Sequence, residues 1–318
     1  IVPLCAPKRG RPTILEKGMS FFMELRFQPL TLAEIPLLRP YFVLQPSRIC
    51  DSTIGGTFLW RDYFRTEYAT AGDTLFLRSK MPHSGETVYS IPMDGDVPQA
   101  LRLLREDCAR RGETLRLFTV PAEDLPLLRT LFPGAREETI PHWADYLYNA
   151  SDLRELRGKH YAGQRNHISQ FTRAYPDGHF EPLTPEMLPR ARAFFRHFEE
   201  MRDKSAETFR EDERKVHEVL DNYALYGFLG GAIVVGDRIV SMAIGEVLGD
   251  TLYVHIEKAD LDYHGAYPMI VREFSRYAAG ETVLYINRED DAGDPGLQKS
   301  KQSYKPCAML EKYLVTVE

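Results

Sequence analysis

The stretch at residues 285–306, YINREDDAGDPGLQKSKQSYKP, decides how the rest of the chain is interpreted. It starts as a short apolar strand and continues as a polar run whose residue types suit chemistry better than packing. Gly293, Pro295 and Gly296 predict a turn between this strand and a short helix. Polar side chains lie on both sides of the turn: Asn287, Arg288, Glu289, Asp290 and Asp291 before it, and Lys299, Lys301, Tyr304 and Lys305 after it. This stretch is therefore the first candidate site.

The composition is that of a soluble globular protein. The chain has 318 residues, 43% hydrophobic and 27% charged, which is enough for two domains of common size. The net charge of −6 argues against a wholly basic nucleic-acid binder and leaves room for a local basic cleft. The four cysteines form no CxxC pair, which favours a reducing, cytoplasmic compartment and argues against a zinc site.

The N-terminal segment predicts a flexible leader. Residues 1–22 lack the apolar centre of a secretory signal, and the chain begins with Ile1, so Met19 or Met23 would be a natural start. The alternative is that the basic residues of this segment contact anionic lipid, which would place the protein peripherally at a membrane. No apolar run approaches the length of about 20 residues that a membrane-spanning helix requires.

The same order of elements occurs twice along the chain. In the first half the pattern predicts a hairpin turning at Gly72, followed by strands and helices at 87–91, 97–111, 115–120, 122–132 and 143–148. In the second half it predicts a hairpin turning at Gly236, followed by elements at 251–258, 266–279, 282–287, 295–304 and 308–317. Because the spacing between matching elements is nearly constant, we predict two similar α/β (α+β) domains with mixed central sheets, at 23–150 and 151–318.

Two other stretches stand out. The aromatic run Phe58, Trp60, Tyr63 and Phe64 is expected to be core. Residues 154–173, RELRGKHYAGQRNHISQFTR, form a basic island between the two halves, with five Lys or Arg and one acid. This island suits a phosphate or carboxylate ligand, and the alternative is a solvated helix face. The charged run at 199–215 is mixed in sign and is expected to be exposed.

The second half contains the layout of a ligand-binding acyltransferase domain. The segment at 258–270, KADLDYHGAYPMI, joins a strand to a helix. It resembles, in a reduced form, the pyrophosphate loop of the acyl-CoA N-acyltransferase (GNAT) superfamily. His264, Gly265 and Tyr267 are its candidate binding residues, because N–H groups at a helix start can hold an anion. On the preceding strand His255 and Glu257 point to one face, where a general base is plausible; Glu246 on the neighbouring hairpin is a similar candidate.

The segments KHYAGQRNHISQF (159–171) and INREDDAGDPGLQKSKQSYKP (286–306) together resemble the bacterial family built on the C-terminal domain of phosphatidylglycerol lysyltransferase. The resemblance covers roughly residues 24–318 and extends to the Fem-type peptidyltransferases. It implies a tandem pair of GNAT-like domains that transfers an aminoacyl group from aminoacyl-tRNA to an amine or hydroxyl acceptor. Lipid-modifying members carry a transmembrane region before this domain, and none occurs in this sequence.

Aminoacyl transfer requires a donor for the developing oxyanion and a proton acceptor, and it requires neither a metal nor a tightly bound cofactor. We assign the candidate catalytic residues to Arg288, Glu289, Lys301 and Tyr304. The candidate substrate-binding residues are Lys159, Arg165, Asn166, His255, Glu257, His264, Gly265, Tyr267, Asn287, Lys299 and Lys305. Two alternatives stay open: an acetyl-CoA-dependent N-acetyltransferase of a small amine, and a non-catalytic binding module with the same fold. The sequence names neither the acceptor nor the oligomeric state.

Overall fold

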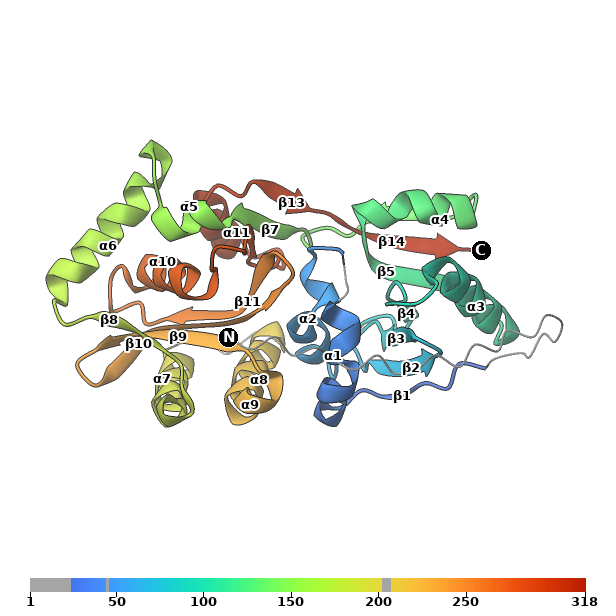
Figure 1. Cartoon of the computed structure of the whole chain (residues 1–318), viewed down its shortest axis with the longest axis horizontal. Coiled ribbons are helices and arrows are strands. Elements are labelled where there is room, and N and C mark those ends of the chain that lie inside the picture. The colour runs from blue at the N-terminus through green and yellow to red at the C-terminus, as the bar shows by residue number, and fades with distance from the viewer. Residues whose placement is uncertain (1–23, 44–45, 202–206) are drawn as a thin grey trace.

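The computed structural model describes residues 24–43, 46–201 and 207–318. The predicted leader at residues 1–22 lies outside the described residues. The molecule is elongated, with two mixed sheets side by side and helices on both (Figure 1). Among the described residues, no helix combines the length and the apolar character needed to cross a membrane.

The first sheet has seven strands. Their spatial order is β1 (Gln28–Pro29), β2 (Glu67–Ala71), β3 (Thr74–Lys80), β4 (Thr87–Tyr89), β5 (Leu115–Pro121), β14 (Lys312–Val317) and β6 (Arg136–Thr139). The predicted hairpin is confirmed, with Gly72 in the left-handed region at its turn. The helical elements of this half are η1 (Leu32–Glu34), α1 (Ile35–Val43), η2 (Cys50–Ser52), α2 (Ile54–Phe58), α3 (Val97–Arg110), η3 (Ala122–Asp124) and α4 (Leu125–Leu131).

The second sheet also has seven strands. Their order is β13 (Ala308–Leu310), β7 (Asp145–Asn149), β12 (Tyr285–Asn287), β11 (Thr251–Ala259), β10 (Arg238–Leu248), β9 (Leu229–Val235) and β8 (His179–Pro182). Its helical elements are α5 (Ala150–Glu155), η4 (Lys159–Tyr161), α6 (Ala162–Ala174), η5 (Pro185–Met187), α7 (Leu188–Glu200), α8 (Glu207–Asp221), α9 (Tyr223–Tyr226), α10 (Ala266–Ala278) and α11 (Pro295–Ser303). The hairpin turning at Gly236 is confirmed.

The two halves exchange strands. β14, from the end of the chain, lies between β5 and β6 in the first sheet, and β7, from the first half, lies between β13 and β12 in the second. The single strand predicted at 308–317 is wrong, because the chain leaves one sheet after Leu310 and enters the other at Lys312. Sheet membership therefore does not follow a single division of the chain at residue 150.

Three apolar cores hold the molecule together. One packs α3 and α4 on the first sheet around Leu101 and Leu117, and another packs α6 and α10 on the second sheet around Phe171 and Ile270. The third joins the halves, since α1 and α2 share it with α7 and α8. Burial of apolar side chains in this shared core favours one fixed arrangement of the two sheets.

Candidate active site

A buried ionic chain lies where the two halves meet. His255 on β11 lies between two carboxylates, with its Nδ1 2.7 Å from Glu289 Oε1 and its Nε2 3.0 Å from Glu246 Oε1. The same Glu246 oxygen accepts the backbone N–H of Gly55 on α2 at 2.7 Å. The chain therefore links the second sheet to a helix of the first half.

The local backbone explains how His255 reaches this position. The pairing of β10 with β11 shifts between Ile244 and Gly245, and His255 is left without a partner on β10. Such a bulge re-aims the side chain of the extra residue. Gly55 packs against the imidazole so closely that a Cβ there would lie 2.2 Å from Nε2, so this position requires glycine.

His255 keeps a positive charge inside the protein. Its side chain is fully buried, which favours the neutral ring, but the hydrogen bonds that the ring donates to Glu246 and Glu289 outweigh burial and raise the pKa of His255 to about 9. Near neutral pH the ring therefore donates to both carboxylates. The second oxygen of Glu246, Oε2, is buried and has no hydrogen-bond partner among the described residues.

A second ion pair lies beside the first. Arg288 Nη2 donates to Glu257 Oε1 at 2.6 Å, and both residues are largely buried. The Arg288 guanidinium lies 4.8 Å from the centre of the Tyr304 ring and 5.7 Å from that of Tyr148. Its Nη1 is buried without a hydrogen-bond partner in the described structure. An unpaired guanidinium nitrogen is a suitable donor to an anionic group of a substrate.

Lys301 on α11 fixes the loop that carries both acids and Arg288. Its Nζ donates to the carbonyl oxygens of Arg288 at 2.6 Å and Glu289 at 3.3 Å, and to that of Asp290. Glu289 has a φ of 57°, a left-handed conformation that is costly for a residue with a side chain. Because the Lys301 ammonium donates to three loop carbonyls, we interpret this candidate catalytic residue as a positioning residue.

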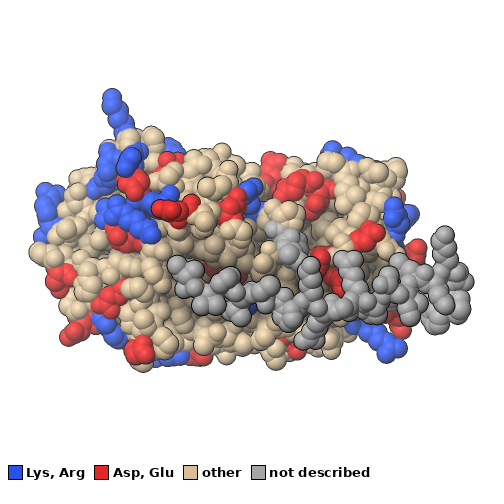
Figure 2. All heavy atoms as spheres, viewed as in Figure 1, with Lys and Arg blue, Asp and Glu red and all other residues tan. Residues whose placement is uncertain are grey.

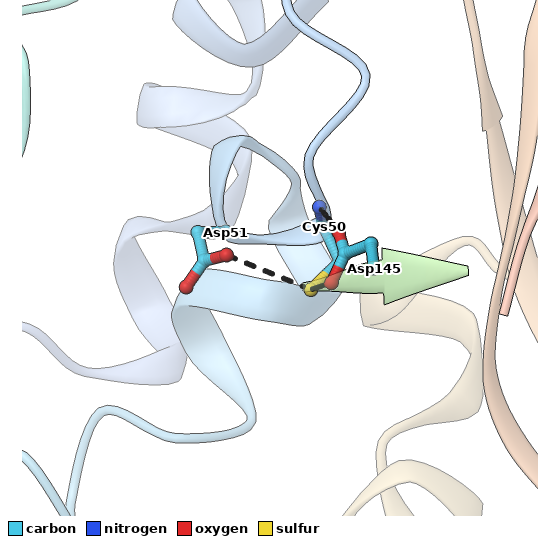
Figure 3. A group of neighbouring side chains, drawn as sticks. All are labelled: Cys50, Asp51 and Asp145. Atoms are coloured by element: carbon cyan, nitrogen blue, oxygen red, sulfur yellow. Dashed lines mark hydrogen bonds between the residues drawn. The ribbon is translucent and has the colours of Figure 1, made fainter. Parts of the chain in front are cut away.

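The end of β12 is tied to a further buried cluster. Asn287 Nδ2 donates to Asp145 Oδ2 at 2.8 Å, and the same oxygen accepts the N–H of Cys50 at 2.6 Å. Figure 3 shows Asp145 and Asp51 on either side of the Cys50 sulfur. Lys312 Nζ lies 2.5 Å from Asp51 and 2.7 Å from Asp145.

Cys50, Asp51 and Asp145 place three potential metal ligands within 4.8 Å of one another. The ammonium of Lys312 already contacts all three, at 3.4 Å from the Cys50 sulfur. Its charge therefore balances the carboxylates from the position that a metal ion would need. The donor set fits a buried lysine better than a metal.

A pocket of about 270 Å³ opens beside these clusters. Glu289, Asp290 and Asp51 form part of its wall, and the rest comes largely from the first half. Its aromatic lining residues are Trp60, Tyr63, Phe64, Tyr89, Phe118 and Trp143. The expectation that the whole aromatic run at 58–64 is core is thus corrected. Phe58 is fully buried, while the other three rings line the pocket.

Apart from the three residues of the loop before α10, the predicted residues separate into two groups. His255, Glu257, Asn287, Arg288, Glu289, Lys301 and Tyr304 lie together in the buried clusters. Lys159, Arg165, Asn166, Lys299 and Lys305 are exposed. Arg165 holds the carbonyls of Leu156 and Gly158, the latter at 2.7 Å. Figure 2 shows Lys and Arg gathered at the α6 end of the molecule. Arg165 therefore lies with the exposed residues and does not join Arg288 in the buried clusters.

The loop before α10 is only partly free to bind an anion. The N–H of Ala266 is used by the Tyr263 carbonyl at 2.9 Å, and Pro268 has none. Gly265 lies against α6, since a Cβ there would be 2.3 Å from the His167 carbonyl oxygen. His264 Nε2 lies 2.9 Å from His167 Nδ1 on the surface, and Tyr267 packs on the second core.

Sequence reasoning missed several residues of the site. Asp145 is the single charged residue of β7 and Lys312 the single charged residue of β14, and this isolation was the available signal. Lys215 belongs to the charged run that we expected to be exposed, yet it is only 5% exposed and lies over the Trp60 ring. The strand exchange brings Asp145 and Lys312 together, so only the three-dimensional fold could pair them.

The comparisons with known proteins agree with the observed fold. A conserved protein of unknown function from Bacteroides thetaiotaomicron is 31% identical, with a TM-score of 0.83 over 92% of this chain and 100% of that one. The C-terminal domain of a putative lysylphosphatidylglycerol synthetase from Agrobacterium fabrum has the same fold, with a TM-score of 0.65 and 12% identity over 91% of this chain and 92% of that one. An uncharacterised protein of Mycoplasmoides gallisepticum is 26% identical over 54% of this chain, and the match spans only 56% of its own length.

The predicted fold class is confirmed as an α/β (α+β) fold on two mixed sheets, which the chain shares with the lysylphosphatidylglycerol synthetase C-terminal domain. Family and fold together point to an acyl- or aminoacyltransferase. The model of the family described as "Phosphatidylglycerol lysyltransferase, C-terminal" matches residues 42–316. The chain therefore belongs to this family.

Proposed function

We propose that the protein transfers an aminoacyl group from aminoacyl-tRNA to an amine or hydroxyl acceptor, at the junction of its two halves. The observation that carries the proposal is the pair of buried ionic clusters around His255 and Arg288 beside an open pocket. Buried, strongly interacting charges next to a cavity are a common feature of catalytic sites.

The residues suit the steps of such a transfer. The acceptor attacks the carbonyl carbon of the aminoacyl ester, and the negative charge that develops on the carbonyl oxygen needs a donor. Arg288 does not itself line the pocket, but it precedes Glu289, which does, and its buried Nη1 has no hydrogen-bond partner among the described residues. We assign Arg288 this role. Glu289 lines the pocket and is hydrogen-bonded to His255. We therefore assign Glu289 the role of the general base that accepts the proton of the acceptor. His255 itself stays charged and positions Glu289.

A tRNA donor is supported by the basic surface. Residues 154–173 carry five Lys or Arg and one acid, and they run from the end of α5 through η4 and α6 at one end of the molecule (Figures 1 and 2). Such a surface can hold the phosphates of RNA outside the pocket. An acyl-CoA donor has less support, because the N–H groups at the start of α10 are partly used or missing.

The test is transfer of a labelled amino acid from a charged tRNA pool to acceptors in a cell extract. We expect transfer by the wild-type protein and loss of at least about 100-fold in rate for Arg288→Gln, which removes an oxyanion donor. The matched control is Arg102→Gln, an exposed residue of α3. Absence of transfer together with absence of tRNA retention on filters at low salt would contradict the proposal.

Acetyl-CoA provides the second arm. A ligand at 100 times its dissociation constant adds about 2.7 kcal/mol to the free energy of unfolding. We expect no change in the melting temperature with acetyl-CoA. A clear rise in the melting temperature would indicate that the donor is an acyl-CoA. The alternative of a non-catalytic binding module predicts that Arg288→Gln leaves every biological readout unchanged.

A further inference from the structure

The pocket beside Glu289 combines aromatic walls with carboxylates. Six of its lining residues are Trp, Tyr or Phe, and three are acids: Asp51, Glu289 and Asp290. No Lys, Arg or His is among the described residues that line it. Aromatic faces and carboxylates both attract organic cations, whereas an anion in the same place would be repelled.

The acids around the pocket outnumber the positive charges that contact them. Five carboxylates belong to the joined clusters: Asp51, Asp145, Glu246, Glu289 and Asp290. Lys312 and His255 are the cations paired with them. Lys301 is not paired with these carboxylates, because its ammonium donates to backbone carbonyl oxygens of the loop. Burial raises the pKa of Asp290 to about 6, because the nearby charge of Lys312 lowers this pKa by less than burial raises it. The wall therefore retains negative charge that a cationic ligand would offset.

Asp290 is placed to meet such a ligand. Its carboxylate lies 4.0 Å from Lys312 Nζ, and its Oδ1 accepts the N–H of Ala292 at 2.9 Å. The side chain is about one quarter exposed and lines the pocket. Trp60, on the same pocket wall, already carries the Lys215 side chain on its ring. Burial lowers the pKa of Lys215 to about 7, so above that pH this amine adds little charge.

We propose that this pocket binds the acceptor of the reaction, and that the acceptor is a small organic amine that binds as its ammonium ion. The volume of about 270 Å³ suits a ligand of amino-acid size. In Figure 1, α6 lies at the far end of the second sheet from α2, β4 and β5, three elements that carry residues of the pocket lining. The basic residues of α6 therefore leave the pocket free for the acceptor. The acidic wall disfavours a phosphate-bearing acceptor such as an anionic lipid headgroup.

The chemistry of the transfer step rests on the proposed function. The bound ammonium loses one proton to a carboxylate, and its nitrogen bonds to the ester carbonyl carbon of aminoacyl-tRNA. The bond between that carbon and the ribose oxygen breaks. The leaving ribose oxygen takes up a proton, and the acceptor nitrogen, which loses its second proton, becomes an amide. No oxidant, reductant or metal is required.

Tryptophan fluorescence gives a direct test of binding. The chain has two tryptophans, Trp60 and Trp143, and both line the pocket. The probes are phenethylamine, phenethyl alcohol and phenylalaninamide, which share one ring. They differ in the ammonium group and in a carboxamide that mimics the aminoacyl donor. Trp60→Phe and Trp143→Phe assign the signal to each indole.

We expect saturable quenching by phenethylamine, and roughly tenfold weaker binding of the alcohol, since a charged hydrogen bond is worth more than a neutral one. Asp290→Asn, which keeps the oxygen that accepts from Ala292, should weaken amine binding by a similar factor. Asp237→Asn, in the exposed turn between β9 and β10, should have no effect.

Equal binding of amine and alcohol by the wild-type protein would overturn the cation site without any variant. Tighter binding of phenylalaninamide than of phenethylamine would assign the pocket to the donor and overturn the acceptor assignment. These measurements involve no tRNA, so their failure is distinct from a failure of the transfer assay.

Discussion

At the scale of single residues, His255 couples the site to stability. Its pKa is raised from 6.5 to about 9 in the folded protein, so its contribution is fully present below pH 6.5 and is lost as the pH rises through 9. We expect His255→Gln to lower the free energy of unfolding by about 3 kcal/mol at pH 6, with the difference narrowing toward pH 9.5.

Denaturant unfolding at the two pH values measures this difference. His83→Gln, an exposed histidine of the first half, is the control and should leave stability nearly unchanged at both. A deficit for His255→Gln that is the same at pH 6 and pH 9.5 would show that the charge of the ring does not contribute.

Lys215 predicts the opposite trend. Burial lowers the pKa of Lys215 from 10.5 to about 7, so between these values the unfolded chain binds more protons than the folded one, and stability due to this residue rises with pH. We expect Lys215→Met to raise the free energy of unfolding on the order of 5 kcal/mol at pH 6.5, with little gain left near pH 10.5. Lys299→Met, on the exposed face of α11, serves as the control, and a gain independent of pH would contradict the prediction.

At the scale of elements, α11 acts as a clamp on the loop that carries Arg288 and Glu289. Lys301→Met removes three hydrogen bonds to the carbonyls of residues 288–290 and should cost about 3 kcal/mol, because donors on a charged group contribute more than neutral ones. Amide exchange in residues 288–292 should accelerate. Lys299→Met, two residues away and exposed, should leave exchange unchanged, and equal effects of the two variants would exclude the clamp.

The α6 region permits a second prediction. Replacement of Arg157, Lys159 and Arg173 by Gln should weaken tRNA binding and reduce the slope of affinity against salt, by roughly one unit for each lost phosphate contact. As the control, Arg102, Arg105 and Arg136 on the other half are replaced by Gln. This changes the net charge by the same amount and should weaken tRNA binding only slightly. Filter binding of tRNA over a salt series compares the two triple variants. An equal loss of affinity in both would show that only the net charge matters.

At the scale of the whole molecule, the exchange of β7 and β14 makes each half incomplete without the other. β14 makes hydrogen bonds to both β5 and β6, and Lys312 on it holds Asp145 on β7. We therefore expect one cooperative unfolding transition for the full chain, with tryptophan fluorescence and circular dichroism changing together. A chain cut after Glu311 should lose the first sheet and should not refold on its own. Two separate transitions would contradict this coupling.

The sequence by itself determined the repeated order of elements, both hairpins and the polar end of β12. Turn glycines and hydrophobic periodicity act locally, so they can be read one segment at a time. The sequence also placed His255, Glu257, Arg288 and Glu289 among the candidate site residues. Only the tertiary structure decided the exchange of strands, the pairing of Asp145 with Lys312, and the opening of a pocket among Trp60 and its neighbours. These depend on contacts between residues far apart in the chain, and no local pattern encodes which of two sheets an apolar strand will join.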